Sequence, residues 1–280
     1  MKVADWEDYK VIATGDGEKL EKWGNVVLLR PDPQVIWRAR KPLAKMPNIN
    51  ARYSRSETGG GTWDILKKFP AEWQIQWKGL KFIVKPMGFK HTGLFPEQAV
   101  NWKRMMELIS KQDREIKILN LFAYTGGASV ACAKAGAKVT HVDASKGMVD
   151  RAKQNAALNG INNIRYIVDD CKKFIEREIR RGQKYDAIIM DPPSYGRGPS
   201  GEMWKIEENL YDFVELTKGV LSDNPLFVLI NSYTTGLQAG VIADILELIF
   251  GKGGIEADEI GLPTEEGIVL PCGNSGFKIF

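Results

Sequence analysis

Hydrophobic and polar positions divide this chain into two parts that differ in pattern. After about residue 96, apolar runs of strand length alternate with longer segments that carry apolar residues at helical spacing. That alternation is typical of an α/β fold with a mostly parallel sheet. The first hundred residues instead hold short alternating segments, broken by prolines and by Gly59–Gly61, which favour strands and turns. We therefore predict a small β-rich domain over residues 1–95 and an α/β domain over residues 96–280.

The α/β part opens with a strand, a turn, a helix and a second strand. An apolar run, 116–122, leads through the turn Ala123–Ala128 into a helix of small residues that Gly136 ends, and a second strand, 138–142, finishes on Asp143. Glycines in such a turn allow a ligand to approach the backbone closely. An acid about 20 residues further on can accept both hydroxyls of a ribose. The pattern predicts a nucleotide-binding βαβ unit, with a purely structural layer as the alternative.

The other segments extend both parts. In the first part we expect strands at 25–29 and 35–38, a long loop over 39–62, and a hairpin of 72–77 with 80–85 that turns at Lys78–Gly79. In the second part we expect helices at 145–159, 172–181, 202–221 and 237–250, strands at 164–168, 187–190 and 226–230, and a final hairpin of 267–270 with 277–280 around Pro271–Gly276.

The turn after the first strand indicates which nucleotide is bound. It reads Tyr124-Thr-Gly-Gly-Ala-Ser129, so it lacks the Gly-x-Gly-x-x-Gly spacing that holds a pyrophosphate on a helix N-terminus, and it lacks a Walker lysine. A nucleoside without a phosphate chain fits such a turn better. S-adenosylmethionine is the common cofactor of that kind.

A second cluster of polar groups follows the strand at 187–190. Asp191-Pro192-Pro193 is delivered to the carboxyl edge of the sheet, where open α/β sheets bind ligands. Because the prolines remove backbone donors, the Pro192 carbonyl and the Asp191 carboxylate remain as acceptors. Such a pair can orient an amine toward a methyl donor, and Tyr195 can stack on a flat base.

At these positions the chain resembles the class I S-adenosylmethionine-dependent methyltransferases, and within them the large-subunit ribosomal RNA methyltransferases that act on cytosine C5 or guanine. The resemblance spans residues 80–280 and rests on Lys90-His-Thr-Gly-Leu-Phe-Pro-Glu-Gln98, Asn120-Leu-Phe-Ala-Tyr-Thr-Gly-Gly127, Val142-Asp-Ala-Ser145, Val168-Asp-Asp170 and Asp191-Pro-Pro-Ser-Tyr195. It implies a seven-stranded, mostly parallel Rossmann-like sheet with helices on both faces and an antiparallel last strand. It also implies that adenosylmethionine lies across the strand ends.

The resemblance and the motifs together define the candidate site. The catalytic candidates are Asp191, Pro192 and Tyr195. The substrate candidates beside them are Pro193, Ser194, Tyr195 and Arg197, within a glycine-rich segment, 194–203, that we interpret as a flap. One acid after the third strand should accept from the adenine amino group, and we favour Asp170, with Cys171 lining the ring. The cofactor-binding candidates are Phe122, Ala123, Tyr124, Thr125, Gly126, Gly127, Asp143, Ala144, Ser145, Asp169, Asp170, Cys171 and Asp191.

The cysteines limit the chemistry of methyl transfer. Methylation of cytosine C5 normally needs a thiolate, and relatives that perform it carry a cysteine after the fifth strand. Here that segment reads Ile230-Asn-Ser-Tyr-Thr-Thr-Gly236 and has no thiol. We therefore expect the acceptor to be a ring nitrogen or exocyclic amine of a base. Cytosine C5 and a protein or small-molecule acceptor stay open as alternatives.

Charge is distributed unevenly along the chain. Residues 28–104 contain 15 lysines and arginines against five acids, a net charge of +10, whereas the whole chain carries +4. A basic segment with interleaved aromatic residues suits looped or single-stranded RNA, and Arg38, Arg40 and Lys41 are the candidate contacts. The alternative is a solvated surface. The six tryptophans of the first part are expected to lie in its core rather than to stack on bases.

Composition narrows the remaining function classes. No secretion signal and no apolar run of membrane-spanning length occurs, so we expect a cytoplasmic protein. Three scattered cysteines and two histidines give no disulfide framework, metal site or histidine-based triad. Two further readings are a nicotinamide-dependent oxidoreductase, which the broken glycine pattern disfavours, and a non-catalytic RNA-binding protein that retains a cofactor pocket. The sequence carries no signal for an oligomeric state.

Overall fold

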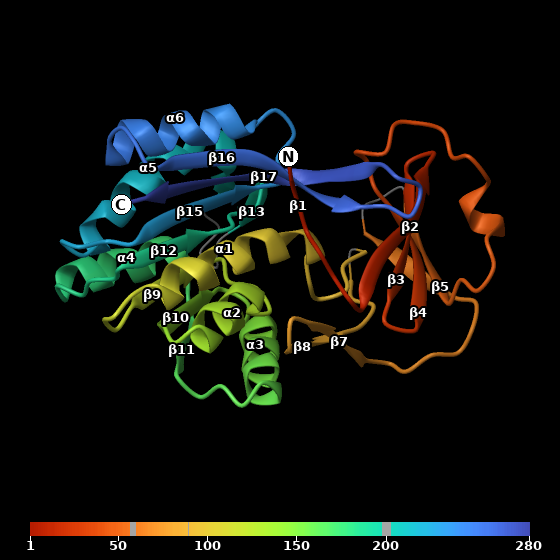
Figure 1. Cartoon of the computed structure of the whole chain (residues 1–280), viewed down its shortest axis with the longest axis horizontal. Helices are drawn as coiled ribbons and strands as arrows, with labels where there is room; N and C mark the ends of the chain where they lie inside the picture. Colours follow the sequence, from red (N-terminus) through yellow and green to blue (C-terminus); the bar gives the residue numbers. More distant parts are fainter. Residues whose placement is uncertain (57–59, 89, 198–202) are drawn as a thin grey trace. The chain divides into compact units, whose positions relative to one another are not determined.

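A computed structural model describes residues 1–56, 60–88, 90–197 and 203–280. The chain forms two compact units, one of residues 1–100 with 260–272 and one of residues 101–259 with 273–280. The chain therefore leaves the first unit, returns to it near its end, and finishes in the second. Sequence patterns did not predict this return, and the limits 1–95 and 96–280 remain a proposal about domains. Figure 1 shows both units coloured along the sequence.

A large sheet forms the frame of the second unit. Its order is β16-β17-β15-β12-β9-β10-β11. The short β1 (Lys2–Val3) adds an edge strand, which pairs in parallel with residues 260–261 of β16. Neighbours from β15 to β11 run parallel, and β17 runs antiparallel to β15. This confirms a mostly parallel sheet with an antiparallel last strand. The strands are β9 (Lys117–Leu121), β10 (Lys138–Asp143), β11 (Ile164–Val168), β12 (Ala187–Met190), β15 (Phe227–Ser232), β16 (Ile255–Pro263) and β17 (Val269–Ile279).

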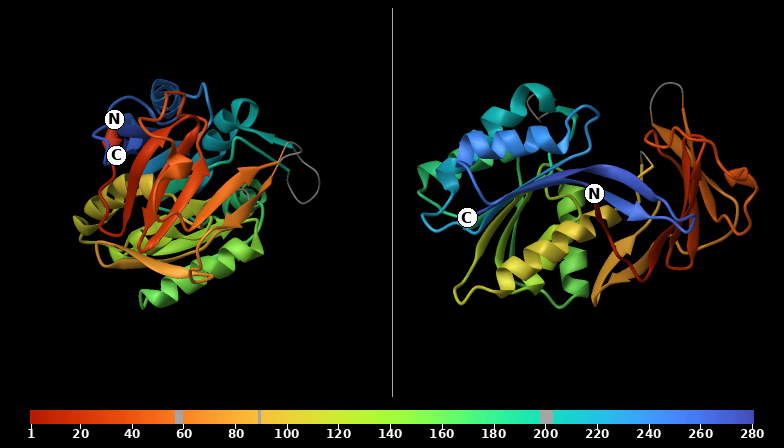
Figure 2. Two further views of the ribbon diagram at one scale, coloured as in Figure 1. Left: turned by 90° about the vertical axis from the view of Figure 1, so that its right-hand side faces the viewer. Right: turned by 45° about the horizontal axis from the view of Figure 1, so that its top comes forward.

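Helices cover both faces of this sheet, as Figure 2 shows. One face carries Leu121, Met190 and Ile230, which pack in a buried cluster with residues of α4 (Cys171–Arg180), α5 (Ile206–Thr217) and α6 (Ala239–Phe250). The alternate residues of the strands point to the opposite face, where Asn120 donates to Ser129 of α2. That face carries α1 (Ala99–Ser110), α2 (Gly127–Lys134) and α3 (Lys146–Leu158). The parallel strands therefore all deliver their carboxyl ends to one edge.

The first unit is rich in strands, as expected. One sheet has the order β2-β3-β4-β5-β6, and a separate hairpin is formed by β7 and β8. That hairpin turns at Lys78 and Gly79, which have φ of 46° and 79°, so the predicted turn is confirmed. The strands are β2 (Tyr9–Gly15), β3 (Glu18–Trp23), β4 (Val26–Pro31), β5 (Ala51–Arg55), β6 (Gly61–Ile65), β7 (Trp73–Trp77) and β8 (Leu80–Val84), with 3₁₀ turns η1 (Leu43–Lys45) and η2 (Pro96–Gln98).

Two predictions in the first unit were wrong. Residues 35–38 form no strand, because the backbone bonds to the turn that follows β2: Gly17 donates to the Val35 carbonyl and Asp16 to the Trp37 carbonyl. The segment 39–62 is not one loop, because it contains η1, β5 and the start of β6. The sequence signal of β5 is weak, because this strand has five residues and only two buried side chains, Ala51 and Tyr53.

Two predictions for residues 202–280 were also wrong. Residues 271–276 do not turn but continue β17, since Asn274, Ser275 and Gly276 pair with residues 230–232 of β15. The turn lies earlier, where Gly267 has φ of 85° and donates to the Thr264 carbonyl. The helix expected from residue 202 begins only at Ile206, after the short strand β14 (Met203–Lys205), and ends at Thr217 before the 3₁₀ turn η3 (Lys218–Val220).

The tryptophans of the first unit lie in or against its core. None of the six is exposed, and Trp23 and Trp77 are almost fully buried. Five of them donate their indole N–H to another group of the same unit: Trp6, Trp37, Trp63, Trp73 and Trp77. Side chains held in this way act as structural elements rather than as base-stacking platforms.

Candidate functional site

The turn after β9 has an unusual backbone. Phe122, Tyr124 and Gly126 all lie in the left-handed region, with φ of 54°, 51° and 83°. Left-handed conformations are strained for residues other than glycine and persist only where the surroundings hold them. Here the Phe122 amide donates to Cys171 Sγ (3.3 Å) and the Tyr124 amide donates to Asp143 Oδ2 (2.8 Å). The ends of β10 and β11 thus fix the shape of the turn.

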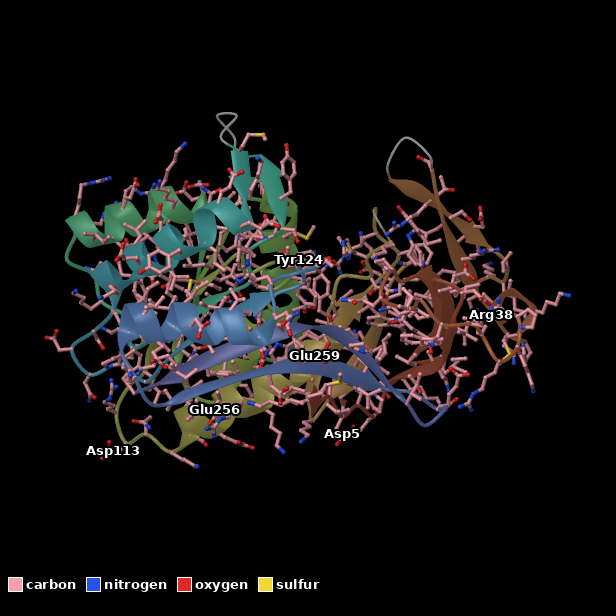
Figure 3. All side chains as sticks on the ribbon, turned by 90° about the horizontal axis from the view of Figure 1, so that it is seen from above. Asp5, Arg38, Asp113, Tyr124, Glu256 and Glu259 are labelled. Carbon is pink, nitrogen blue, oxygen red and sulfur yellow. The ribbon has the colours of Figure 1, made fainter. Side chains whose placement is uncertain are left out.

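The two glycines of the turn are needed for packing. A Cβ on Gly126 would approach Ala152 of α3 to 2.9 Å, and a Cβ on Gly127 would lie 2.5 Å from the Trp102 ring of α1. Packing against α3 and α1 is therefore sufficient by itself to require glycine at these two positions. They let α2 begin tightly against its neighbouring helices, and this places the turn at the sheet edge. Figure 3 labels Tyr124 within it.

Asp143 ends β10 with a half-buried carboxylate. Each oxygen accepts one backbone N–H at 2.8 Å, from Tyr124 and from Ser145. Burial raises the pKa of Asp143, and these two hydrogen bonds oppose that rise. Because a carboxylate has about four lone-pair sites, capacity remains for two further donors such as the hydroxyls of a ribose. The next two residues, Ala144 and Ser145, are exposed.

The two acids after β11 have different environments. Asp169 forms an ion pair with Arg177 and accepts the Asp170 amide, so its carboxylate is engaged within the protein. Asp170 caps α4 by accepting the Lys173 amide at 2.9 Å. Cys171 is buried beneath the turn, where burial raises the pKa of its thiol. Asp169 thus has an ion pair, whereas the bond of the Asp170 carboxylate is a helix cap. This difference agrees with our expectation that Asp170 accepts from the adenine amino group.

The segment after β12 lies at the same edge of the sheet. Met190 pairs with Leu121 of β9 and Ile230 of β15, so Asp191 follows level with Phe122 and Asn231. Asp191 is half-buried and Pro192 is buried, whereas Pro193, Ser194 and Tyr195 are exposed. The Ser194 and Thr234 hydroxyls lie 2.6 Å apart and join the loops that follow β12 and β15.

A tryptophan that sequence reasoning overlooked anchors this segment. The Trp204 indole donates to the Pro193 carbonyl at 2.6 Å, and its ring packs against Phe122 and Phe213 with centroids 5.6 and 5.5 Å away. Trp204 thereby connects the turn after β9, the segment after β12 and α5. The signal available in the sequence was one aromatic residue just after a glycine-rich stretch.

The expected flap has a defined base. β13 (Tyr195–Arg197) pairs with β14, and the Tyr195 hydroxyl donates to Met203 Sδ at 3.1 Å. Residues 198–202, and with them the centre of the expected flap, lie outside the described residues. Arg197 belongs to β13, but its side chain is not part of the description.

The remaining substrate candidates belong to the first unit. Arg38, Arg40 and Lys41 are exposed on the segment between β4 and η1, where Figure 3 labels Arg38. The cofactor candidates all belong to the second unit.

None of the three thiols, all of which lie within the described ranges, has the environment of a nucleophile. Cys132 and Cys171 are buried, and burial raises the pKa of both thiols. Burial likewise raises the pKa of Cys272, on β17. A thiol of raised pKa is protonated at neutral pH and is a poor nucleophile.

Within the part of the chain that the structure describes, histidine, cysteine and acidic residues form no group of three that could hold a metal ion. Among the same residues, no helix has the length and apolar character needed to cross a bilayer.

The sheet order, the strained turn after β9 and the acids at the strand ends define an α/β fold of the methyltransferase type. Comparison with known proteins identifies the group. The chain belongs to the S-adenosylmethionine-dependent methyltransferase family, whose model matches residues 50–216. It is similar to the crystal structure of the S-adenosylmethionine-dependent methyltransferase from Agrobacterium tumefaciens, with 33% identity and a TM-score of 0.93 over 100% of this chain and 92% of that one. Its cofactor is thus adenosylmethionine.

Named relatives share only part of their length with this chain. Ribosomal RNA large subunit methyltransferase K/L of Shewanella frigidimarina is 37% identical over 177 residues, which cover 62% of this chain and 24% of that protein. Ribosomal RNA large subunit methyltransferase I of Aeromonas salmonicida is 36% identical over 124 residues, which cover 43% of this chain and 30% of that protein. The matched regions span less than a third of these two relatives.

Proposed function

We propose that this methyltransferase modifies a base of RNA, in particular ribosomal RNA, at a ring nitrogen or an exocyclic amine. The relatives named as ribosomal RNA methyltransferases support the RNA class. A ribosomal substrate would place the protein in the cytoplasm.

The observation that carries this proposal is the position of Asp191-Pro192-Pro193. The strand register sets Asp191 level with Phe122 of the cofactor turn. The prolines supply no N–H, so this segment offers acceptors, the Asp191 carboxylate and the Pro192 carbonyl, rather than backbone donors. An amine or ring N–H that donates to such acceptors is held with its lone pair free for the methyl group.

The residues of the site fit adenosylmethionine. Asp143 would hold the ribose, Asp170 would accept from the adenine amino group, and the turn Phe122–Gly127 would enclose the rest. When bound, the cofactor supplies a methyl group on a sulfonium that is already activated. The protein then mainly provides proximity and orientation. Asp191 orients the acceptor amine and takes its proton, and Tyr195 holds the planar base.

Cytosine C5 is the alternative acceptor within the same family. That chemistry adds a thiolate to C6 of the base, whereas the end of β15 offers Asn231 and Ser232. Both are buried, and the side-chain Oδ1 of Asn231 accepts from the Asn101 side-chain amide at 3.0 Å. The three protonated thiols described above favour a nitrogen acceptor over C5.

The charge of the segment 28–104 supports RNA over a protein acceptor. Arg38, Arg40 and Lys41 are exposed cations in the segment 28–104, which has a net charge of +10. Phosphate contacts release counterions, so the affinity for single-stranded RNA falls as the salt concentration rises. The slope of log K against log salt should become smaller by about 0.7 for each contact that is removed. Neutralising the three together and titrating RNA at several salt concentrations would test this part.

The acceptor class can be tested by transfer of a labelled methyl group. The wild-type protein is incubated with labelled adenosylmethionine and with RNA from a strain that lacks the gene. We expect the wild-type protein to transfer label to material that ribonuclease digests and protease does not. The Asp191→Ala variant should transfer no label. Label released only by protease, or found only in small molecules, would reject RNA as the acceptor.

A further inference from the structure

A braced loop of the first unit presents a lysine in an unusual setting. The loop follows β8 and is closed by two backbone bonds, from Lys85 to the Thr92 carbonyl (3.1 Å) and from Met87 to the His91 carbonyl (2.8 Å). The Trp63 indole also donates to the Met87 carbonyl, at 2.8 Å. Lys90 lies near the tip with φ of 56°. A lysine in the left-handed region is strained, which indicates that its surroundings determine its position.

A buried ion pair holds the backbone of Lys90. Arg30 Nη1 donates to the Lys90 carbonyl at 2.8 Å. The same guanidinium binds Glu21 through two bonds of 2.6 and 2.9 Å, and Glu21 also accepts from the Tyr9 hydroxyl at 2.5 Å. Glu21 is completely buried, and Arg30 is nearly so. A bidentate pair of this kind is among the stronger interactions in proteins. Through Arg30 it holds the backbone of the loop at Lys90 in place.

The ammonium of Lys90 lacks a matching counter-ion. Its one hydrogen bond is to the Pro31 carbonyl at 3.2 Å, and no carboxylate of the described residues lies within ion-pair distance. Asp32 is the nearby acid, but it pairs with Lys19 at 3.1 Å. Lys19, Arg30 and Arg55 add positive charge around Lys90. Burial is the main cause that lowers the pKa of Lys90 to about 8. The three cations lower this pKa further, whereas Asp32 opposes the change.

We propose that Lys90 is the centre of an oxyanion site that binds a phosphodiester group of the RNA strand to be methylated. A desolvated cation among other cations is stabilised by an incoming anion, and a phosphate supplies that charge together with several acceptor oxygens. The proposal deepens the proposed function, because it rests on RNA as the acceptor.

The neighbouring histidine fits the same site. His91 is half-buried, and burial together with Arg30, Lys90 and Lys19 lowers its pKa to about 4. Its imidazole is therefore neutral at physiological pH and offers one N–H donor to an oxyanion without a further charge. Its ring packs edge-on against Phe95, with the centroids 5.5 Å apart.

Competitive acetylation followed by mass spectrometry tests the site without any methylation assay. The acetylation rate of Lys90 should level off near the pH of its lowered pKa. A short single-stranded oligoribonucleotide should lower that rate at neutral pH by about tenfold, which corresponds to one unit of pKa. Inorganic phosphate should protect more weakly. Protection by phosphate but not by the oligoribonucleotide would overturn the strand assignment. Equal protection by adenosylhomocysteine alone would place the anion on the cofactor instead.

Matched variants test the same site by affinity. Lys90→Gln should weaken oligoribonucleotide binding at low salt by about tenfold and reduce the salt slope by about 0.7. Lys90→Arg keeps the charge and should stay within about threefold of wild type. Lys10→Gln is the control, because Lys10 is an exposed lysine of the same unit that already pairs with Glu265. Equal weakening in Lys90→Gln and Lys10→Gln would overturn the proposal. A protein that shows this binding but no methyl transfer to RNA would contradict the proposed function alone.

Discussion

Asp143 gives the sharpest prediction about cofactor binding. Its carboxylate accepts the Tyr124 and Ser145 amides and keeps capacity for two ribose hydroxyls. Each charge-assisted hydrogen bond contributes about 1.5–3 kcal/mol, so Asp143→Ala should cost about 3–6 kcal/mol of binding free energy. That corresponds to an increase in Kd for adenosylhomocysteine of roughly 10²–10⁴-fold.

The same substitution should also destabilise the turn. The Tyr124 amide is partly buried and would lose its acceptor, at a cost of about 1–3 kcal/mol, whereas the exposed Ser145 amide can bond to water. Asp143→Asn keeps the size of the side chain but not its charge. It should therefore lie between wild type and Asp143→Ala in affinity.

Calorimetry with adenosylhomocysteine measures the affinity, and thermal unfolding without ligand measures stability separately. Asp150→Ala is the control: Asp150 is an acid on α3 that pairs with Lys146 and Lys153 in an exposed cluster. We expect it to stay within about twofold of wild type, since exposed ion pairs contribute little. A folded Asp143→Ala protein that binds adenosylhomocysteine with wild-type affinity would refute the assignment of the ribose to Asp143.

Three further predictions concern catalysis and stability. Asp191→Ala should abolish methyl transfer and leave the Kd for adenosylhomocysteine within about threefold of wild type, because in the proposed mechanism this acid contacts the acceptor. A methyl-transfer assay and calorimetry measure the two effects. A loss of cofactor affinity as large as the loss of transfer would contradict this role. Trp204→Phe removes the N–H that the Pro193 carbonyl accepts but keeps a ring beside Phe122, so turnover should fall about five- to tenfold at unchanged melting temperature; unchanged turnover would show that the bond does not position the loop. Burial lowers the pKa of His141 from 6.5 to about 4, so the unfolded chain binds the extra proton between these values, and the unfolding free energy should fall by up to about 3 kcal/mol as the pH drops through that window. Urea unfolding on both sides of the window should show a flatter pH dependence in His141→Gln, and an identical slope would exclude His141 as the cause.

Local patterns sufficed for the centre of the second unit. The apolar run of β9, the small residues of α2 and the acid after β10 follow one another within a single βαβ unit, so short-range periodicity predicts them. The hairpin turn at Lys78–Gly79 was predictable for the same reason, since a two-residue turn depends mainly on its own residue types.

Long-range pairing explains what the sequence could not predict. Residues 271–276 have the composition of a turn but extend β17, because β15 offers them backbone partners. Glycine is required at position 276 by packing rather than by a turn, because a Cβ there would lie 2.6 Å from Ile242 of α6. Trp204 was missed because its partners, Phe122 and Pro193, come from other elements of the unit. Local composition carries no information about such contacts.

The proposed transfer to a base nitrogen can be tested most directly by identifying the methylated nucleoside. RNA from a strain that lacks the gene is methylated by the purified protein, digested to nucleosides and analysed by mass spectrometry against standards. We expect a base methylated at a ring nitrogen or an exocyclic amine, formed by wild type and by Cys171→Ser but not by Asp191→Ala. Formation of 5-methylcytidine, or loss of transfer in a Cys171→Ser protein that folds and binds adenosylhomocysteine like the wild type, would contradict the account.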